Sequence, residues 1–327
     1  MPLDWSPLVE LVRTHQQILL MTHVRPDADG LGSQLALAEA LDTLGKRPRV
    51  VIASNLSPRY AFLDPHRTRI ENFPPAEAFA DVDAIFVMDT GTWGQLGDFG
   101  PWMQTMAVPK AVIDHHRTQD DLGGLAFVDT TAEATGRLSY EIIRALGVSL
   151  TPTMAHHLFM ALALDTGWFR HPNTTAATFR LAEELVLAGA NPTPLYEQLF
   201  ECAPLARLKL TGRALERMQT RSGGKIAFTE VYLSDYDATG AVPGDTEDLI
   251  NYPRSIDGVE IALIFIEQPE GGTKVSFRAR AADVSKLAER FQGGGHKLAA
   301  GARLIDSLPI AREKVLTAAR EALAAMV

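Results

Sequence analysis

Cysteine is almost missing from this 327-residue sequence, in which Cys202 is the only one. A single cysteine excludes an internal disulfide and is typical of a protein kept in a reducing compartment, so we expect a cytoplasmic location. No neighbouring residue in the sequence would lower the pKa of this thiol, which favours a packing role over a nucleophilic one.

Long apolar runs are also lacking. No stretch approaches the ~18 consecutive apolar residues of a membrane span, and the first residues lack the basic segment and apolar run of a signal peptide. We therefore expect no membrane partner. Hydrophobic residues still make up 46% of the chain and charged residues 22%, which is typical of a globular protein with well-buried cores.

An excess of positive charge is the third absence. The net charge of −9 argues against a protein that coats long nucleic acid. Residues 1–203 carry 14 Lys/Arg and 24 Asp/Glu, a net −10, whereas residues 204–327 carry 17 and 16, a net +1. The acidic part is suited to divalent cations, and the second part has positive groups available for a phosphate-bearing ligand.

Three short apolar segments each end in Asp or His. Residues 111–113 run into Asp114-His115-His116, residues 18–22 run into His23, and residues 83–88 run into Asp89. Such Val/Ile-rich runs are typical of buried strands in a parallel sheet. The polar residues after one such strand could simply begin a solvated loop. Three strands with the same ending instead predict a shared cleft at the carboxyl edge of the sheet, where open α/β sheets bind ligands.

The order of strand and helix patterns predicts an α/β fold with two domains. Over residues 1–203 the two patterns alternate, which is typical of a doubly wound, mainly parallel sheet. In that part we expect a loop over residues 23–33, followed by a helix over 34–44 that stops at Gly45. A connecting helix over residues 204–221 then leads into strands, which indicate a smaller α/β domain over residues 204–327.

Carboxylates and imidazoles in these motifs could together hold metal ions. The residues are His23, Asp27, Asp29, Asp89, His115 and Asp165. Taken singly, Asp27 and Asp29 could be turn formers and Asp165 a helix end. Taken together, four carboxylates repel unless cations compensate them, and two divalent ions would balance the charge. The mixed ligand set favours Mn²⁺, with Mg²⁺ or Co²⁺ as alternatives. Two such ions would activate a water and hold a phosphoryl group.

These motifs resemble those of a known family. The set His23-x3-Asp27-x-Asp29, Asp89-Thr90, Asp114-His115-His116 and Asp165-Thr166-Gly167 is similar in order and rough spacing to the four motifs of the DHH phosphoesterases. The resemblance implies a first metal on His23, Asp27 and Asp89. It implies a second on Asp29, Asp89, His115 and Asp165, with Asp89 bridging. Asp114 would orient an imidazole, and His116 would face the scissile phosphate and stabilise its developing charge.

A glycine run supplies a second part of the resemblance. Gly293-Gly294-Gly295-His296 lets backbone N–H groups approach an anion and resembles the substrate lobe of the NrnA-type nanoRNases and pAp phosphatases. Strand alternation over residues 273–280 places three polar side chains on one face, although such a face is often only solvated. The substrate-binding residues implied are Arg254, Ser276, Arg278, Arg280, Gly293, Gly294, Gly295 and His296.

The resemblance implies a metal-dependent phosphoesterase. It would hydrolyse short oligoribonucleotides, including dinucleotides such as pApA, to mononucleotides by two-metal in-line attack, and would remove phosphate from pAp. The partners expected are therefore short RNA or pAp, with a homodimer as one open assembly. The alternatives are a manganese pyrophosphatase or exopolyphosphatase, and a nucleotide-binding sensor without turnover.

Overall fold

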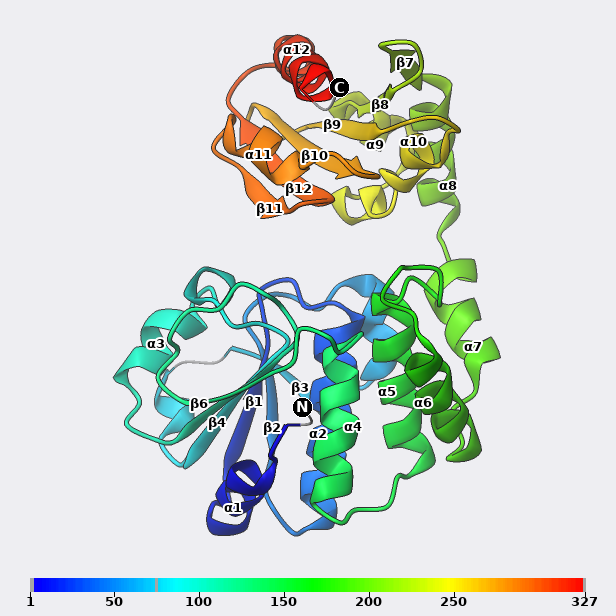
Figure 1. The fold of residues 1–327 in the computed structure, drawn as a ribbon. Helices are drawn as coiled ribbons and strands as arrows, with labels where there is room; N and C mark the ends of the chain where they lie inside the picture. Colours follow the sequence, from blue (N-terminus) through cyan, green and yellow to red (C-terminus); the bar gives the residue numbers. More distant parts are fainter. Residues whose placement is uncertain (1–2, 74–75, 326–327) are drawn as a thin grey trace. The chain divides into compact units, whose positions relative to one another are not determined.

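The computed structural model describes residues 3–73 and 76–325 (Figure 1). The chain divides into two compact units, Met1–Cys202 and Ala203–Val327. The sequence pattern placed a boundary between residues 203 and 204. Each unit has a core of its own and is described by itself.

The first unit is built on a parallel sheet of six strands in the order β3-β2-β1-β4-β5-β6. The strands are β1 (Ile18–Met21), β2 (Arg49–Ile52), β3 (Ile70–Asn72), β4 (Ala84–Met88), β5 (Lys110–Asp114) and β6 (Leu125–Val128). Leu20 of β1 pairs with Val50 of β2 on one side and with Phe86 of β4 on the other. The strand order therefore reverses at β1, and the predicted doubly wound parallel sheet is confirmed.

Helices cover both faces of this sheet because the strands are apolar on both faces. The helices are α1 (Ser6–Thr14), α2 (Ala28–Thr43), α3 (Phe99–Thr105), α4 (Thr135–Ala145), α5 (Pro152–Asp165), α6 (Ala176–Leu187) and α7 (Pro192–Tyr196). Leu20 and Phe86 pack in the core beneath α2, α4 and α5. Leu19 and Val87 point to the opposite face and pack with Phe99 of α3. This alternation is the two-residue period of a strand.

Helix α2 begins six residues earlier than the sequence pattern predicts. The expected loop over residues 23–33 is therefore wrong in its second half. Asp27 caps the helix, because its Oδ1 accepts the N–H groups of Asp29 at 2.9 Å and Gly30 at 3.2 Å. A Cβ added to Gly32 would lie 2.4 Å from the carbonyl oxygen of His157 in α5. The glycines thus serve close packing of α2 against α5, where local pattern indicated a loop.

Short turns connect the elements of the first unit. They are the 3₁₀ turns η1 (Pro58–Leu63), η2 (Ala76–Phe79) and η3 (Trp93–Gln95), and the π-helical turn η4 (Glu197–Glu201). Gly45, with φ +72°, follows the end of α2 as predicted. In the part of the chain described here, no helix has both the length and the apolar run that crossing a membrane requires.

The second unit holds a six-stranded mixed sheet in the order β11-β12-β10-β9-β8-β7. Its strands are β7 (Gln219–Arg221), β8 (Ile226–Val231), β9 (Ile261–Glu267), β10 (Thr273–Ala279), β11 (Gly294–His296) and β12 (Ala299–Leu304). Its helices are α8 (Leu205–Glu216), α9 (Leu233–Thr239), η5 (Pro243–Thr246), α10 (Asn251–Ser255), α11 (Val284–Glu289) and α12 (Leu308–Ala324). The connecting helix predicted to reach residue 221 ends at Glu216, and β7 follows it. Strands β8 and β9 are parallel, and the other neighbours are antiparallel.

The two faces of this second sheet differ at β10. Val275 and Phe277 are fully buried in a core shared with α11 and α12. The neighbouring Ser276 and Arg278 point to the other face and remain partly exposed. The glycine run contributes strand β11, in which Gly294 pairs with Gly301 of β12. On the face opposite this core, β10 thus places polar side chains beside the buried, apolar Ala262 and Ile264 of β9.

Candidate metal centre

The carboxyl ends of three adjacent strands meet at the predicted site. His23 follows β1, Asp89 follows β4, and His115 follows β5. Asp27 and Asp29 join them from the start of α2, and Asp165 joins them from the last residue of α5. The ligand atoms lie within 4.8 Å of one another in each of three groups: His23, Asp27 and Asp89; Asp29, His115 and Asp165; and Asp89, His115 and His116.

Two imidazoles are oriented in the same way. Nδ1 of His23 donates to the carbonyl oxygen of Val24 at 2.9 Å, and Nδ1 of His115 donates to that of Ala132 at 3.1 Å. Each ring therefore turns Nε2 toward the carboxylates. His23 Nε2 lies 3.5 Å from Asp89 Oδ2, and His115 Nε2 lies 3.6 Å from Asp89 Oδ1. A backbone acceptor on Nδ1 is the usual way in which a metal-binding histidine is held.

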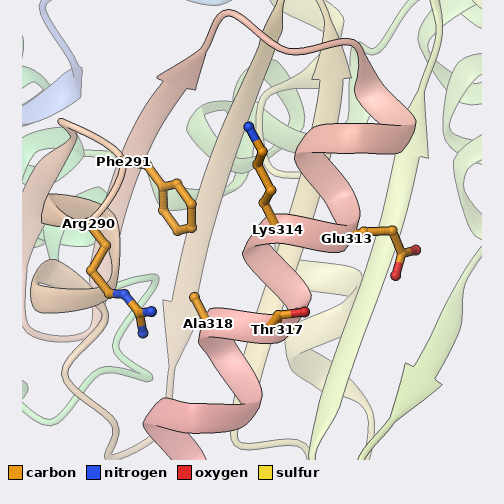
Figure 2. A pocket seen from close by; sticks show the side chains of 6 residues that line it. All are labelled: Arg290, Phe291, Glu313, Lys314, Thr317 and Ala318. Carbon is orange, nitrogen blue, oxygen red and sulfur yellow. The ribbon is translucent and has the colours of Figure 1, made fainter.

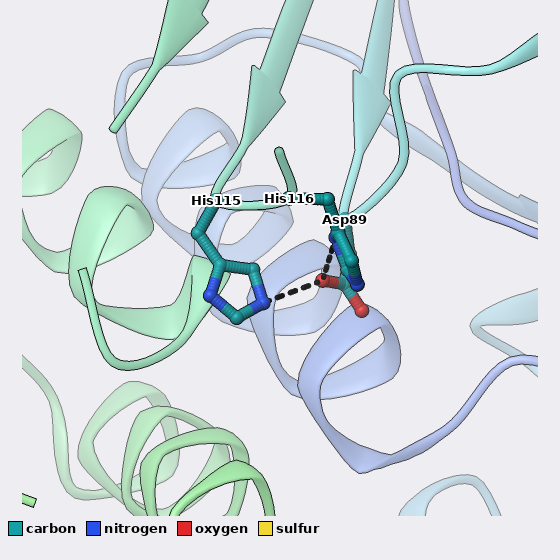
Figure 3. Close-up of side chains that lie close together, drawn as sticks. All are labelled: Asp89, His115 and His116. Carbon is teal, nitrogen blue, oxygen red and sulfur yellow. Dashed lines mark ion pairs between the residues drawn. The ribbon is translucent and has the colours of Figure 1, made fainter. Parts of the chain in front are cut away.

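Asp89 lies between the two groups and uses a different oxygen toward each histidine. Figure 3 shows its carboxylate beside His115 and His116. Its backbone has φ +62°, a left-handed conformation that is uncommon outside glycine and better tolerated by Asp than by most residues. Such strained residues cluster at functional sites because the surrounding structure has to hold them. Here the strain places one carboxylate between two candidate cation positions.

Asp29 is held by the first turn of α4, which sequence reasoning missed. The carboxylate is 1% exposed and accepts the N–H of Thr135 at 2.7 Å and of Gly136 at 2.8 Å. The Thr135 hydroxyl donates to Asp89 Oδ1 at 3.0 Å. The N-cap residue of α4, Ala134, has no side-chain capping bond. In the sequence, the signal is that an alanine stands at the start of this helix, where a capping side chain is common. Without a cap, the N–H groups of the first turn need other acceptors.

Protons stay on the site when no cation is present. Burial, together with the charges of Asp89 and Asp165, raises the pKa of Asp29 well above its usual value. Burial also raises the pKa of Asp165 to about 7, partly opposed by His115. Burial disfavours a charged His23, but Asp27 and Asp89 outweigh it and raise the pKa of this imidazole to about 11. The crowded carboxylates thus attract positive charge, as protons or as cations.

The residues fit divalent cations. The Nε2-to-carboxylate distances of 3.5 to 3.9 Å are too long for hydrogen bonds and leave room for an ion between the atoms. Oxygen and imidazole donors suit ions such as Mn²⁺ or Mg²⁺. Thr22 Oγ1 is fully buried and has no hydrogen-bond partner among the described residues. It lies beside Gly30 of α2, and a buried hydroxyl without a protein partner is typically satisfied by a water or an ion.

His116 is held differently from the other two histidines. Its Nδ1 lies 2.7 Å from Oδ1 of the fully buried Asp114, whose Oδ2 accepts from Gln119 Nε2 at 2.6 Å. The bond to Asp114 raises the pKa of His116 to about 9. Burial opposes ionisation of Asp114, but the His116 hydrogen bond and charge lower the pKa of this carboxyl. In the metal-free protein His116 is therefore an imidazolium near neutral pH.

The predicted substrate residues of the second unit lie on α10 and on the sheet. Arg254 is in α10, while Ser276 and Arg278 are in β10. Burial and the positive charge of Arg254 lower the pKa of Arg278, and the negative charge of Asp248 partly opposes this. Among the described residues, neither arginine forms an ion pair within 4.0 Å. Arg280 lies just after β10, is exposed, and donates to the Ile256 carbonyl at 3.4 Å.

The three glycines at residues 293–295 differ in whether the fold requires a glycine at their position. A Cβ on Gly293 would lie 2.2 Å from the carbonyl oxygen of Gly301, and Gly295 has φ +143°. The fold itself therefore requires these two glycines. A Cβ on Gly294 would meet nothing within 4 Å, so the described structure does not require a glycine there. His296 ends β11, and its side chain lies outside the described part of the chain.

A separate hollow of about 490 Å³ lies between helix α12 and the two residues that follow α11 (Figure 2). Its lining consists of Arg290, Phe291, Glu313, Lys314, Thr317 and Ala318. Arg290 is paired with Glu321 at 2.7 Å, and Lys314 with Asp306 at 2.8 Å. The positive side chains of Arg290 and Lys314 are thus already neutralised. No residue predicted to bind substrate lines this hollow.

Comparison with known proteins places the chain in a family. Residues 17–163 match the DHH family N-terminal domain, and residues 223–325 match the DHHA1 domain. A protein from Thermus thermophilus named bifunctional oligoribonuclease and PAP phosphatase NrnA is 31% identical, over 94% of this chain and 90% of that one. The chain belongs to the DHH family.

Other relatives of this DHH-family chain agree. A Bacillus subtilis protein with the same name is 28% identical over 90% of this chain and 92% of its own length. A crystal structure of an exopolyphosphatase-related protein from Bacteroides fragilis superposes with a TM-score of 0.90 at 22% identity, covering 97% of this chain and 94% of that one. The structural match confirms the α/β fold, and the family matches confirm the predicted resemblance.

Proposed function

We propose that this chain is a two-metal phosphoesterase that hydrolyses short oligoribonucleotides, pApA included, to mononucleotides and removes phosphate from pAp. One observation supports this most: six side chains from separate parts of the sequence, Asp89 among them, converge in groups of carboxylates and imidazoles. The names of the relatives at 27–31% identity support the choice of substrates. The net negative charge of the chain supports short ligands over long nucleic acid.

We assign the cation ligands as two sets that share Asp89. His23, Asp27 and Asp89, which form one group, would hold one cation. Asp29, His115 and Asp165, which form another, would hold the second together with Asp89, which lies beside His115. Mn²⁺ is the proposed ion, with Mg²⁺ or Co²⁺ as alternatives, because oxygen and imidazole donors are mixed. When bound, such cations activate a water and neutralise phosphoryl oxygens.

His116 is the proposed catalytic donor. As an imidazolium it retains an N–H on Nε2 while Nδ1 is bound to Asp114. That N–H would stabilise the negative charge that develops on the phosphoryl group. Gln119 and Asp114 keep the ring in place, since both oxygens of Asp114 are used inside the protein. This arrangement suits a donor whose direction does not change during turnover.

The second unit would bind the nucleotide. Arg254 and Arg278 offer two positive charges that repel each other and form no ion pair within the described residues, which suits a phosphate group. Ser276, Arg280, Gly293, Gly295 and His296 complete the proposed substrate set. Gly294 is the residue where a ligand could most closely approach the backbone, because the fold leaves space beside its Cα.

An assay on four substrates tests the proposal. Purified protein is stripped with a chelator, reloaded with Mn²⁺, and given pAp, an RNA dinucleotide, pApA and pyrophosphate in parallel. We expect hydrolysis of the three nucleotides and little of pyrophosphate. Asp89→Asn should abolish turnover, and the exposed Asp257→Asn should not. Preferential hydrolysis of pyrophosphate would indicate the polyphosphate alternative, and a bound, uncleaved nucleotide would indicate a sensor.

Assembly and location stay predictions. A homodimer is tested by sedimentation of the full chain over a range of concentrations, since its mass would then double. The cytoplasmic location predicted from the single cysteine is tested by fractionation of cells that produce the protein.

A further inference from the structure

The first turn of α4 contacts two candidate ligands that come from different elements. The backbone N–H of Thr135 and the next N–H, of Gly136, bind the two oxygens of Asp29 in α2. The Thr135 hydroxyl binds Asp89, which follows β4. Thr135 is fully buried and is itself no candidate ligand. One residue thus touches two carboxylates of the second proposed cation set, and one of them, Asp89, is also assigned to the first set.

These contacts decide which lone pairs of the carboxylates remain available. Each carboxylate oxygen has two acceptor positions. Asp29 Oδ1 accepts from Gly136 and, at 3.3 Å, from Ser33, so both of its positions are used. Asp29 Oδ2 accepts from Thr135 and keeps one position, on the side where His115 Nε2 lies at 3.7 Å.

The acceptor positions of Asp89 are limited in the same way. Oδ1 accepts from the Thr135 hydroxyl and keeps one position near His115. Oδ2 lies near His23. Without the hydroxyl, the carboxylate of Asp89 could rotate about its χ2 torsion, which is a soft one. The hydroxyl therefore keeps one oxygen of Asp89 directed toward His115 and the other toward His23.

We propose that Thr135 is a positioning residue that sets Asp29 and Asp89 in one relative geometry and so couples the two cation positions. The inference rests on the metal-binding part of the proposed function. Gly136 supports it, because a Cβ there would lie 2.6 Å from Cβ of Ala161 and displace α4 from α5. Packing against α5 thus holds the first turn of α4 in place, and this turn holds Asp29 and Asp89.

Two substitutions separate this role from ordinary packing. Thr135→Val keeps the shape and both backbone N–H groups but removes the donor to Asp89. Thr135→Ser restores the donor with a smaller side chain. Loss of a group that orients a metal ligand typically costs about 10- to 100-fold in metal affinity. We expect a loss of about tenfold or more for Val at the weaker Mn²⁺ site, and most of the wild-type affinity for Ser.

The control is Thr229→Val in the second unit. Thr229 is also buried, and its hydroxyl is bonded to the carbonyl oxygen of Ala214, not to a carboxylate of the site. Mn²⁺ affinities and stoichiometries of the full-length proteins are measured by titration calorimetry. Electron paramagnetic resonance then measures the fraction of bound Mn²⁺ present as coupled pairs, and thermal unfolding of the chelated proteins checks the fold.

The inference is supported if Val weakens the second Mn²⁺ and reduces the coupled fraction, while Ser and the Thr229 control do not. It is overturned if Val binds two Mn²⁺ with wild-type affinity and coupling, a result that leaves the proposed function intact. It is also overturned if Ser is as defective as Val, since packing would then be the cause. A wild-type protein that binds no Mn²⁺ would refute the proposed function itself.

Discussion

Histidines of this site differ in the group that holds Nδ1. In His23 and His115 a neutral backbone carbonyl accepts a hydrogen bond from Nδ1, so Nε2 is the nitrogen that can give a lone pair to a cation. In His116 the acceptor is the carboxylate of Asp114. A carboxylate stabilises the imidazolium, whereas a carbonyl does so much less. Two neighbouring histidines can therefore serve as ligand and as proton-bearing donor.

Replacing His116 tests this division. His116→Ala should reduce kcat by about 10²- to 10³-fold, the usual effect of removing one transition-state donor, and change Mn²⁺ affinity little. Steady-state kinetics and calorimetry measure the two effects. The exposed His66→Ala is the matched control and should change neither. Equal turnover in the His116 variant would exclude its proposed role.

Single residues of the site could be predicted where ionisable side chains follow several strands in the same way. Asp114-His115-His116 and Asp89 could be found because a buried strand ends abruptly in ionisable groups. Thr135 could not, because a threonine at a helix start is ordinary. Its importance comes from Asp29, which is 106 positions away in the sequence. Contacts of that range depend on packing that local pattern does not encode.

At the scale of elements, glycines in helices reveal how closely α2 approaches α5. Gly32→Ala and Gly212→Ala both replace a helical glycine, and helix propensity alone favours alanine by about 1 kcal/mol. A Cβ on Gly212 of α8 would meet nothing within 4 Å, whereas one on Gly32 would meet the His157 carbonyl. We expect Gly212→Ala to stabilise and Gly32→Ala to destabilise, the latter by about 1–3 kcal/mol.

Denaturant unfolding measures both changes, with probes in each unit. Since Gly32 lies on the helix that carries Asp29, its alanine variant should also bind Mn²⁺ more weakly. A neutral or stabilising Gly32→Ala would contradict the close helix contact.

Strand β11 gives a second matched pair. Gly293→Ala would clash with Gly301, and we expect it to lower the stability of the second unit. Gly294→Ala has space and should fold normally, yet raise KM for pAp, because the added methyl group would occupy the proposed approach of the ligand. Kinetics and thermal unfolding separate the two effects. An unchanged KM for Gly294→Ala would remove this glycine from the substrate site.

Helices and strands were predicted best where the hydrophobic periodicity agrees with the residues at their ends. Strands β1, β2, β4 and β5 were found from short apolar runs, and α5 from its long apolar pattern. The start of α2 was misplaced because Gly30 and Gly32 look like loop residues. In the fold they allow a close approach to Thr22 and to α5. Packing against a neighbour therefore outweighed local propensity.

For the whole molecule, the site links stability to pH. In metal-free protein the pKa of Asp165 is raised from 3.8 to about 7, and those of His116 and His23 from 6.5 to about 9 and 11. Each group binds its proton more tightly when folded. Its stabilisation is therefore full below the unfolded pKa and is lost as pH rises through the folded one.

We expect the melting temperature of chelated protein to fall between pH 6 and pH 9. Excess Mn²⁺ should reverse the trend, because cations compete with these protons and bind better at higher pH. Calorimetric melting at several pH values, with and without Mn²⁺, measures this. Asp165→Asn should flatten the lower part of the metal-free curve. A melting temperature that rises with pH in the chelated protein would contradict the assignment.

Two units with separate cores could be anticipated from the change in charge and pattern near residue 204. The order of strands within each sheet could be anticipated only in part. Parallel pairing around β1 follows from the alternation of strands and helices. The parallel pairing of β8 with β9 in an otherwise antiparallel sheet, and the position of β11 at the sheet edge, depend on contacts between distant segments.

The lone thiol offers a practical opportunity. Cys202 is exposed, so the packing role predicted from the sequence is wrong, and it is the last residue of the first unit. A maleimide dye would consequently attach at one known place on the native sequence, with no engineered labelling position. Fluorescence from that dye would report on the joining segment while Mn²⁺ or pAp is added.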